Sequence, residues 1–168
     1  MEIKILDIDT QAIEARLVSL NAKKTFQGLR TITYFKNDKD NMEPFLKLTE
    51  ENEKLKLTSQ NRENREEIKL FVSRKEECMK LLASLGYFPL SEVKAKRTSY
   101  ELGTIDFDID EFAGIQAFLE VDMGSNPSVS LEEILSSLNI IYNQRGQMST
   151  LEIVNHYRKN YFELYRLA

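Results

Sequence analysis

Alternation of apolar and charged residues, repeated in segment after segment, is the feature of this sequence that most constrains its fold. Residues 118–122 show it in short form: Leu119 and Val121 are apolar, whereas Glu120 and Asp122 are acidic. Successive side chains of a β-strand point to opposite faces, so the two carboxylates share one face and the apolar pair the other. The pattern predicts an antiparallel sheet with one face packed on a core. Several such strands closed into a barrel would line a wet, charged interior and turn their apolar faces towards helices.

Strands and helices can be placed along the whole chain from such periodicities. Strands are predicted at 2–8, 23–36, 45–49, 54–60, 66–72, 93–102, 104–112 and 118–123. Helices are predicted at 10–21, 74–85, 131–141 and 149–166. Asp9 or Thr10 is the expected cap of the first helix, and Ser130 with Glu133 forms the expected capping box of the third. The pattern is that of a single α+β domain over residues 1–168.

Composition excludes several classes of function. The net charge of −4 gives no basic footprint for nucleic acid. Cys78 is the only cysteine and His156 the only histidine, so neither a disulfide framework nor a thiolate or histidine metal cluster is expected. No apolar run reaches the length of about 20 residues that a membrane span needs, and the N-terminus has no signal-peptide pattern. We therefore expect a cytoplasmic protein with no membrane partner.

The charged faces of the predicted strands carry both signs. Asp108, Glu120 and Asp122 form an acidic set, which Glu2 joins if the first strand lies beside them. Oxygen-only carboxylate clusters suit Mg²⁺ or Mn²⁺, and a polyphosphate with bound metal needs carboxylates for the metal and cations for its own oxygens. The alternative is a charged sheet face in plain contact with solvent, where such pairs contribute little. The cations come from separate strands: Lys4, Lys47, Lys56, Lys69 and Arg97.

An ordered set of short motifs over residues 1 to about 123 resembles the CYTH family, the triphosphate tunnel enzymes that include class IV adenylyl cyclase and thiamine triphosphatase. The first motif, Glu-Ile-Lys-Ile-Leu-Asp-Ile-Asp at 2–9, is similar to the end of the family's Glu-x-Glu-x-Lys strand. Two motifs differ in part from the family pattern: Leu46-Lys47-Leu48-Thr49 stands where the family has Leu-Arg-x-Arg, and Phe118-Leu119-Glu120-Val121-Asp122 is similar to Phe-x-Glu-x-Glu. The other motifs are Ala22-Lys23-Lys24, Gly28, Tyr34-Phe35, Arg65-Glu66-Glu67, Lys96-Arg97-Thr98-Ser99-Tyr100, Phe107-Asp108 and Gly114.

The resemblance implies an eight-stranded antiparallel β-barrel, a closed triphosphate tunnel over about 1–123, with C-terminal helices over about 130–167. It implies a triphosphate-containing small molecule inside the tunnel and Mg²⁺ or Mn²⁺ on the carboxylates. The implied catalytic residues are Glu2, Asp108 and Glu120. The implied phosphate-binding residues are Lys4, Lys47, Lys56, Lys96 and Arg97, and the implied metal ligands are Glu2, Asp108, Glu120 and Asp122.

Departures from the family pattern leave the activity open. The first Glu of Glu-x-Glu-x-Lys is missing, Lys47 and Thr49 replace arginines, and Asp122 replaces a glutamate. Lysine does not reproduce the bidentate phosphate recognition of arginine. One hypothesis is therefore a Mg²⁺- or Mn²⁺-dependent triphosphate hydrolase or adenylyl cyclase. The others are a catalytically impaired tunnel protein that binds phosphorylated ligands or partners without turnover, and a scaffold whose aromatic C-terminal helix supports a homodimer.

Overall fold

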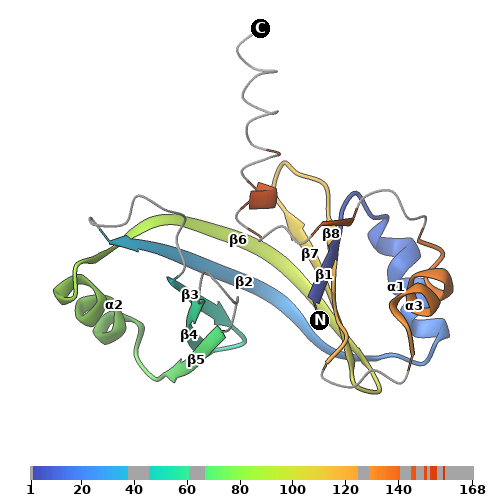
Figure 1. Ribbon diagram of the computed structural model, residues 1–168, viewed down its shortest axis with the longest axis horizontal. Coiled ribbons are helices and arrows are strands. Elements are labelled where there is room, and N and C mark those ends of the chain that lie inside the picture. Colours follow the sequence, from blue (N-terminus) through green and yellow to red (C-terminus); the bar gives the residue numbers. More distant parts are fainter. Residues whose placement is uncertain are drawn as a thin grey trace, which may run out of the picture. The chain divides into compact units, whose positions relative to one another are not determined.

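The structure is a computed structural model that describes residues 2–37, 46–60, 67–124, 129–140, 145–146, 150, 152–154 and 157. In these residues the elements follow the order β1 (Glu2–Ile5), α1 (Thr10–Ser19), β2 (Lys23–Asn37), β3 (Leu46–Glu51), β4 (Lys54–Gln60), β5 (Glu67–Val72), α2 (Lys75–Ser84), β6 (Tyr87–Leu102), β7 (Ile105–Phe112), β8 (Phe118–Asp122), α3 (Leu131–Ser137) and β9 (Arg145–Gly146). Figure 1 shows these elements with their labels. The fold is α+β, as the sequence predicts.

The chain forms two compact units. The first comprises residues 1–27 and 96–168, and the second comprises residues 28–95. The long strands β2 and β6 contribute residues to both units.

Side-chain caps fix where two of the helices begin. The Asp9 carboxylate accepts a hydrogen bond from the backbone N–H of Ala12 at 3.1 Å, ahead of α1. Ser130 and Glu133 form the reciprocal capping box of α3. Each cap satisfies backbone N–H groups that have no partner inside the helix. Both caps are confirmed predictions.

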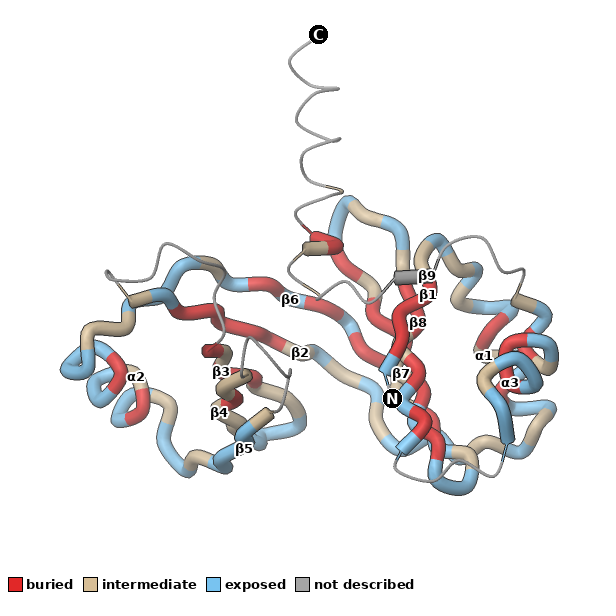
Figure 2. Tube along the Cα trace, in the orientation of Figure 1, coloured by how far each residue is buried: buried red, intermediate tan, exposed pale blue. Residues whose placement is uncertain are grey.

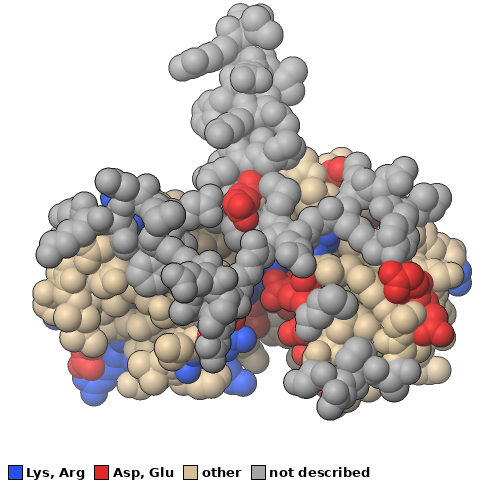
Figure 3. Space-filling view, viewed as in Figure 1, with Lys and Arg blue, Asp and Glu red and all other residues tan. Residues whose placement is uncertain are grey.

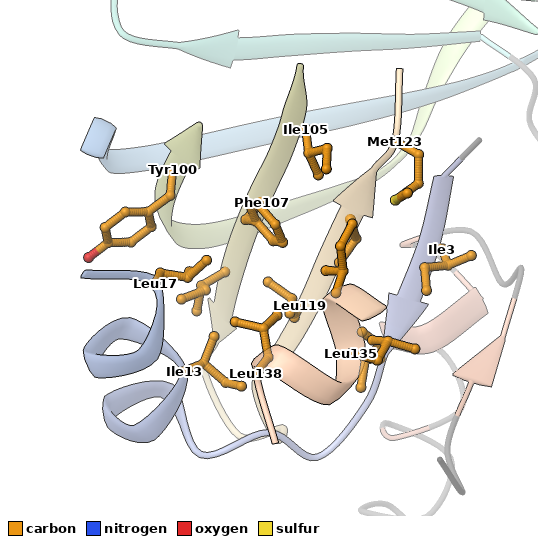
Figure 4. Close-up of a cluster of buried hydrophobic side chains, with 14 residues drawn as sticks. Ile3, Ile13, Leu17, Tyr100, Ile105, Phe107, Leu119, Met123, Leu135 and Leu138 are labelled. Carbon is orange, nitrogen blue, oxygen red and sulfur yellow. The ribbon is translucent and has the colours of Figure 1, made fainter. Parts of the chain in front are cut away.

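The core of the first unit lies between one face of β1, β7 and β8 and the helices α1 and α3, which cover that face (Figures 1 and 4). Leu119 and Val121 are fully buried in this core, with Phe107 and Leu17 packed in the same cluster. Figure 2 shows buried residues running along β7 and β8. The prediction that Leu119 and Val121 face a core, and that the neighbouring carboxylates face the other way, is confirmed.

The second unit is a meander of strands backed by α2. Phe35, Leu46 and Leu48 pack against Cys78 and Leu82 of α2. Cys78 is buried there, and burial raises the pKa of its thiol, which suits an inert core position. The two-residue turn between β3 and β4 has φ of 49° and 61° at Asn52 and Glu53. This left-handed backbone matches the strand twist of a tight hairpin.

The sheet is open, so the predicted closed eight-stranded barrel is wrong. In the described part of the chain nine strands pair in the order β5-β4-β3-β2-β6-β7-β8-β1-β9, and each pair of known register is antiparallel. Closure by hydrogen bonds requires the two terminal strands to pair. The outer edge of β1 instead pairs with β9, and β5 ends the order on the other side. Ile68, Leu70 and Phe71 of β5 are exposed, at 73%, 61% and 73%.

Some predictions fall outside the described residues. They include His156, the motif residues Arg65 and Glu66, and most of the helix expected at 149–166. Residues 150, 152–154 and 157 of that helix are helical, with Ile153 and Val154 buried. None of the helices in the described ranges has the combination of length and apolar composition that a membrane span requires.

Candidate functional site

The side of β1, β7 and β8 that faces away from the apolar core carries an acidic face. We define it by Glu2, Lys4, Asp106, Asp108, Asp110, Glu120 and Asp122. Residues directly opposite in an antiparallel pair present their side chains on the same face. The register therefore places Glu120 between Lys4 on β1 and Asp108 on β7, and places Asp122 between Glu2 and Asp106.

Arg97 of β6 holds the inner carboxylates of this face. Its Nε and Nη2 donate to the two carboxylate oxygens of Asp110 at 2.7 and 2.6 Å, and Nη1 donates to Asp108. Nη2 also lies 3.6 Å from Glu120. Arg97 is 4% exposed and Asp110 is fully buried. Burial alone would lower the pKa of Arg97, but Asp110, Asp108 and Glu120 raise it well above its usual range, so the guanidinium stays charged.

Lys4 is the second internal cation of the acidic face. Its ammonium contacts Glu2 and lies 3.4 Å from Glu120, while the residue is only 6% exposed. Burial lowers the pKa of Lys4, and the charges of Glu120 and Glu2 more than reverse the effect, so the net shift is upward. Glu120 thus lies between two cations supplied by the protein itself.

The carboxylates expected to bind metal are engaged in these contacts. Asp108 accepts from Arg97 through Oδ2 and from the Ser99 hydroxyl through Oδ1 at 2.5 Å. Within the described ranges no cluster of three or more acidic, histidine or cysteine side chains has the arrangement of a metal site. Burial raises the pKa of Asp108, and the Arg97 charge opposes that rise. As arranged, the donor set fits the two internal cations and does not fit a divalent ion.

A basic face lies on β2–β5 of the second unit, on the side opposite Leu46 and Leu48. The register brings together one face of each strand, defined by Arg30, Tyr34, Lys47, Thr49, Glu51, Lys54, Lys56, Thr58, Glu67 and Lys69. Cations outnumber carboxylates in this set. In the view of Figure 3 the visible charge of the second unit is mostly Lys and Arg, and that of the first unit mostly Asp and Glu.

Lys56 is a half-buried cation of the basic face with other cations around it. It forms no ion pair with any residue that the structure describes, whereas Lys47 and Lys69 both bind Glu67 at 3.1 Å. Burial lowers the pKa of Lys56, and the nearby charges of Arg30 and Lys69 lower it further. The Glu51 charge opposes these effects only in part, so an anionic ligand would favour the charged form of this half-buried ammonium.

Two hydroxyls add donors to the basic face. Thr49 lies directly opposite Lys56, and Thr58 lies directly opposite both Lys47 and Lys69. Both threonines are buried, and neither hydroxyl has a hydrogen-bond partner in the described part of the chain. Thr49 stands where the family resemblance expects an arginine, so a short neutral donor replaces a long cationic fork here.

The structure brings together some of the predicted site residues and separates others. Lys4, Arg97, Asp108 and Glu120 meet in the first unit, and Lys47 and Lys56 share the basic face of the second. Lys96 joins neither set. It is exposed and forms its ion pair with Glu111 at 2.9 Å, because adjacent residues of a strand point to opposite faces.

Asp110 is a site residue that the sequence analysis missed. It carries the same alternation as Asp106 and Asp108, but nothing in the pattern distinguished it as the buried partner of an arginine. A usable signal was the run of alternating aspartates facing a basic strand, because a fully buried carboxylate needs a charged partner.

Solved structures of other proteins resemble this chain over most of its length. A proposed adenylate cyclase from Vibrio parahaemolyticus is 14% identical, with a TM-score of 0.80, 92% of this chain covered and 97% of the other. A proposed adenylate cyclase from Bacillus halodurans is 16% identical, with a TM-score of 0.62 and coverages of 89% and 94%. A proposed adenylyl cyclase from Hippeastrum, with a reported dominant triphosphatase activity, is 15% identical, with a TM-score of 0.61 and coverages of 95% and 96%.

The fold is CYTH-like. No protein-family model matches the chain, and no curated protein matches its sequence. The structural likeness therefore carries the CYTH-like assignment by itself, and the chemistry of the site rests on this chain's own residues. The resemblance predicted from the sequence is confirmed at the level of the fold.

Proposed function

We propose that this CYTH-like protein binds a triphosphate-containing compound through the basic face of β2–β5. The observation that carries the proposal is Lys56, a half-buried ammonium without an ion-pair partner in the described residues, whose pKa is lowered by burial and by Arg30 and Lys69. Phosphate oxygens are strong acceptors that would neutralise it. Anion binding converts a like-charge repulsion into an attraction, so the face gains stability when occupied.

The distribution of donors favours an extended polyanion over a single small anion. Lys47, Lys56 and Lys69 come from three consecutive strands, and neighbouring strands lie about 4.8 Å apart. A chain of phosphoryl groups can contact several of them at once. The unpartnered hydroxyls of Thr49 and Thr58 lie on the same face and offer neutral donors to the same ligand.

Turnover is the second candidate function. The acidic face supports it, with Glu2, Asp108 and Glu120 as the proposed catalytic residues, and so does the triphosphatase activity reported for the similar Hippeastrum protein. Hydrolysis or cyclisation would use Mg²⁺ or Mn²⁺ held by Glu2, Asp108, Glu120 and Asp122. These side chains do not form a metal site as arranged, which favours binding without turnover.

Titration calorimetry with tripolyphosphate, ATP and thiamine triphosphate, in EDTA and then with Mg²⁺ or Mn²⁺, tests the first proposal. We expect binding of at least one ligand in EDTA, and about 10- to 100-fold weaker binding by Lys56→Gln, since a hydrogen bond to a charged group contributes about 1.5–3 kcal/mol. Lys80→Gln is the matched control, because Lys80 is an exposed residue of α2 in the same unit.

Absence of binding of all three compounds contradicts the proposal. Equal weakening by Lys56→Gln and Lys80→Gln also contradicts it, because that result indicates attraction to net charge without a built site. Release of inorganic phosphate from any of the compounds above the buffer rate, lost in Glu120→Gln, establishes the second candidate.

A further inference from the structure

The acidic face already contains the cations that balance its inner carboxylates. Arg97 contacts Asp110, Asp108 and Glu120, and Lys4 contacts Glu120 and Glu2. All four carboxylates thereby have a cation supplied from β1 or β6. The hydroxyl of Ser99 takes the remaining oxygen of Asp108.

We propose that Arg97 and Lys4 take the place of a divalent metal on this face, so that Asp108 and Glu120 are ligands of a guanidinium and an ammonium and the protein needs no divalent cation at these residues. Arg97 is then a positioning residue, because it orients the carboxylates of Asp108 and Asp110. This role rests on the acidic face alone and stands whether or not the basic face binds a triphosphate.

Burial prevents Arg97 from leaving this position. The Arg97 side chain is 5% exposed and that of Asp110 is 0% exposed. Arg97 donates two parallel hydrogen bonds to the Asp110 carboxylate. Release of the guanidinium would leave Asp110 charged and without its bidentate partner inside the protein, which is strongly unfavourable. The guanidinium is therefore fixed in place.

A guanidinium and a metal ion also require different arrangements of the carboxylate oxygens around them. The planar fork of arginine matches the two oxygens of one carboxylate and still offers a donor to its neighbour. A divalent ion instead needs several oxygen ligands at about 2.0–2.6 Å, and Mg²⁺ keeps several of its bound water molecules among them. The carboxylates of Asp108 and Asp110 point their oxygens at the Arg97 nitrogens, so metal binding would require these bonds to break.

Mn²⁺ binding to the wild-type protein tests the proposal directly. Electron paramagnetic resonance reports free Mn²⁺, and thermal unfolding with 1 mM Mn²⁺ reports stabilisation. A site with Kd tenfold below the metal concentration would raise Tm by about 3–6 °C. We expect Mn²⁺ to raise the Tm of the wild type by less than about 1 °C. A larger rise that Glu120→Gln and Asp108→Asn both keep also agrees with the proposal, because the Mn²⁺ then binds at other residues. A shift of about 1 °C or more that either substitution abolishes overturns the proposal.

Removal of the internal cation supplies the second test. Arg97→Gln should create a Mn²⁺-dependent rise in Tm that the wild type lacks, because the freed carboxylates repel one another until a cation binds. Lys96→Gln, at the adjacent exposed residue, should create none. A folded Arg97→Gln protein without the gain overturns the replacement of a metal by Arg97. If that variant does not fold, the wild-type Mn²⁺ measurement decides.

Discussion

Arg97 and Asp110 form a bidentate ion pair in the interior of the first unit, with nitrogen–oxygen distances of 2.7 and 2.6 Å and no exposure of the aspartate. The two residues are thirteen positions apart and come from β6 and β7. A buried pair of this kind adds little net stability over an apolar pair, but the loss of one partner leaves a bare charge.

Asp110→Asn should lower the free energy of unfolding by about 3–5 kcal/mol, because the buried guanidinium loses its main counter-ion. Urea denaturation measures the change. Asp106→Asn is the matched control on the same strand. Burial, Asp122 and Glu101 raise the pKa of Asp106, so its neutralisation should leave stability unchanged or slightly higher. Equal losses in the two variants would contradict the role of the ion pair.

Lys56→Met should stabilise the ligand-free protein at pH 7 by up to about 1 kcal/mol, because it removes a half-buried charge from a cluster of cations. The pKa of Lys56 in the folded protein lies below its unfolded value of 10.5. The charged ammonium therefore destabilises the folded protein fully at pH values below the folded pKa, and this destabilisation disappears as the pH rises to 10.5. The stability gain of the variant should fade over the same interval. A variant less stable than the wild type at pH 7 would count against this prediction.

Tyr157→Phe should change the alkaline end of the stability profile. The Tyr157 hydroxyl donates to Asp7, and burial together with that carboxylate raises the pKa of Tyr157 to about 12. The neutral phenol is favoured in the folded state, so its contribution is present below about pH 10 and is lost between about pH 10 and 12. Absorbance titration should show one tyrosine ionising near pH 12 in the wild type. Persistence of that step in the variant would refute the assignment.

Leu119→Ala should destabilise the protein by about 2–5 kcal/mol, because Leu119 is fully buried in the core beneath α1 and α3 and the substitution leaves a cavity. Val18→Ala on α1 is the control. Val18 is 60% exposed, and alanine has the higher helix propensity, so we expect no loss. Chemical denaturation of both variants tests whether Leu119 lies on the side of β8 that faces the core.

Local rules were enough to predict most of the elements and the sides on which their residues lie. The alternation at Leu119 and Glu120 determines which side chain is buried, and the caps at Asp9 and Ser130 mark helix starts, because each depends on residues within a few positions. The same alternation places the adjacent residues Lys96 and Arg97 on opposite faces of β6. The sequence analysis nevertheless predicted both as phosphate-binding residues, and a strict use of the alternation would have excluded one of them.

Contacts between distant segments could not be predicted in this way. Closure of the sheet depends on which strand takes the outer edge of β1, and two residues of β9 take it. The burial of Asp110 depends on an arginine from another strand, and alternation cannot rank Asp106, Asp108 and Asp110 by depth. The distribution of site residues over two compact units is likewise a property of the folded chain.

The open edge of β5 has a consequence for handling the protein. An exposed strand edge with large apolar side chains such as Ile68, Leu70 and Phe71 is a template for aggregation in concentrated solution. Glu67 and Lys69 interrupt the apolar residues with charges of both signs, and charge on an edge strand discourages another strand from docking. These two side chains therefore act as gatekeepers, and their protection weakens as salt screens them, so concentrated stocks should precipitate sooner at high ionic strength.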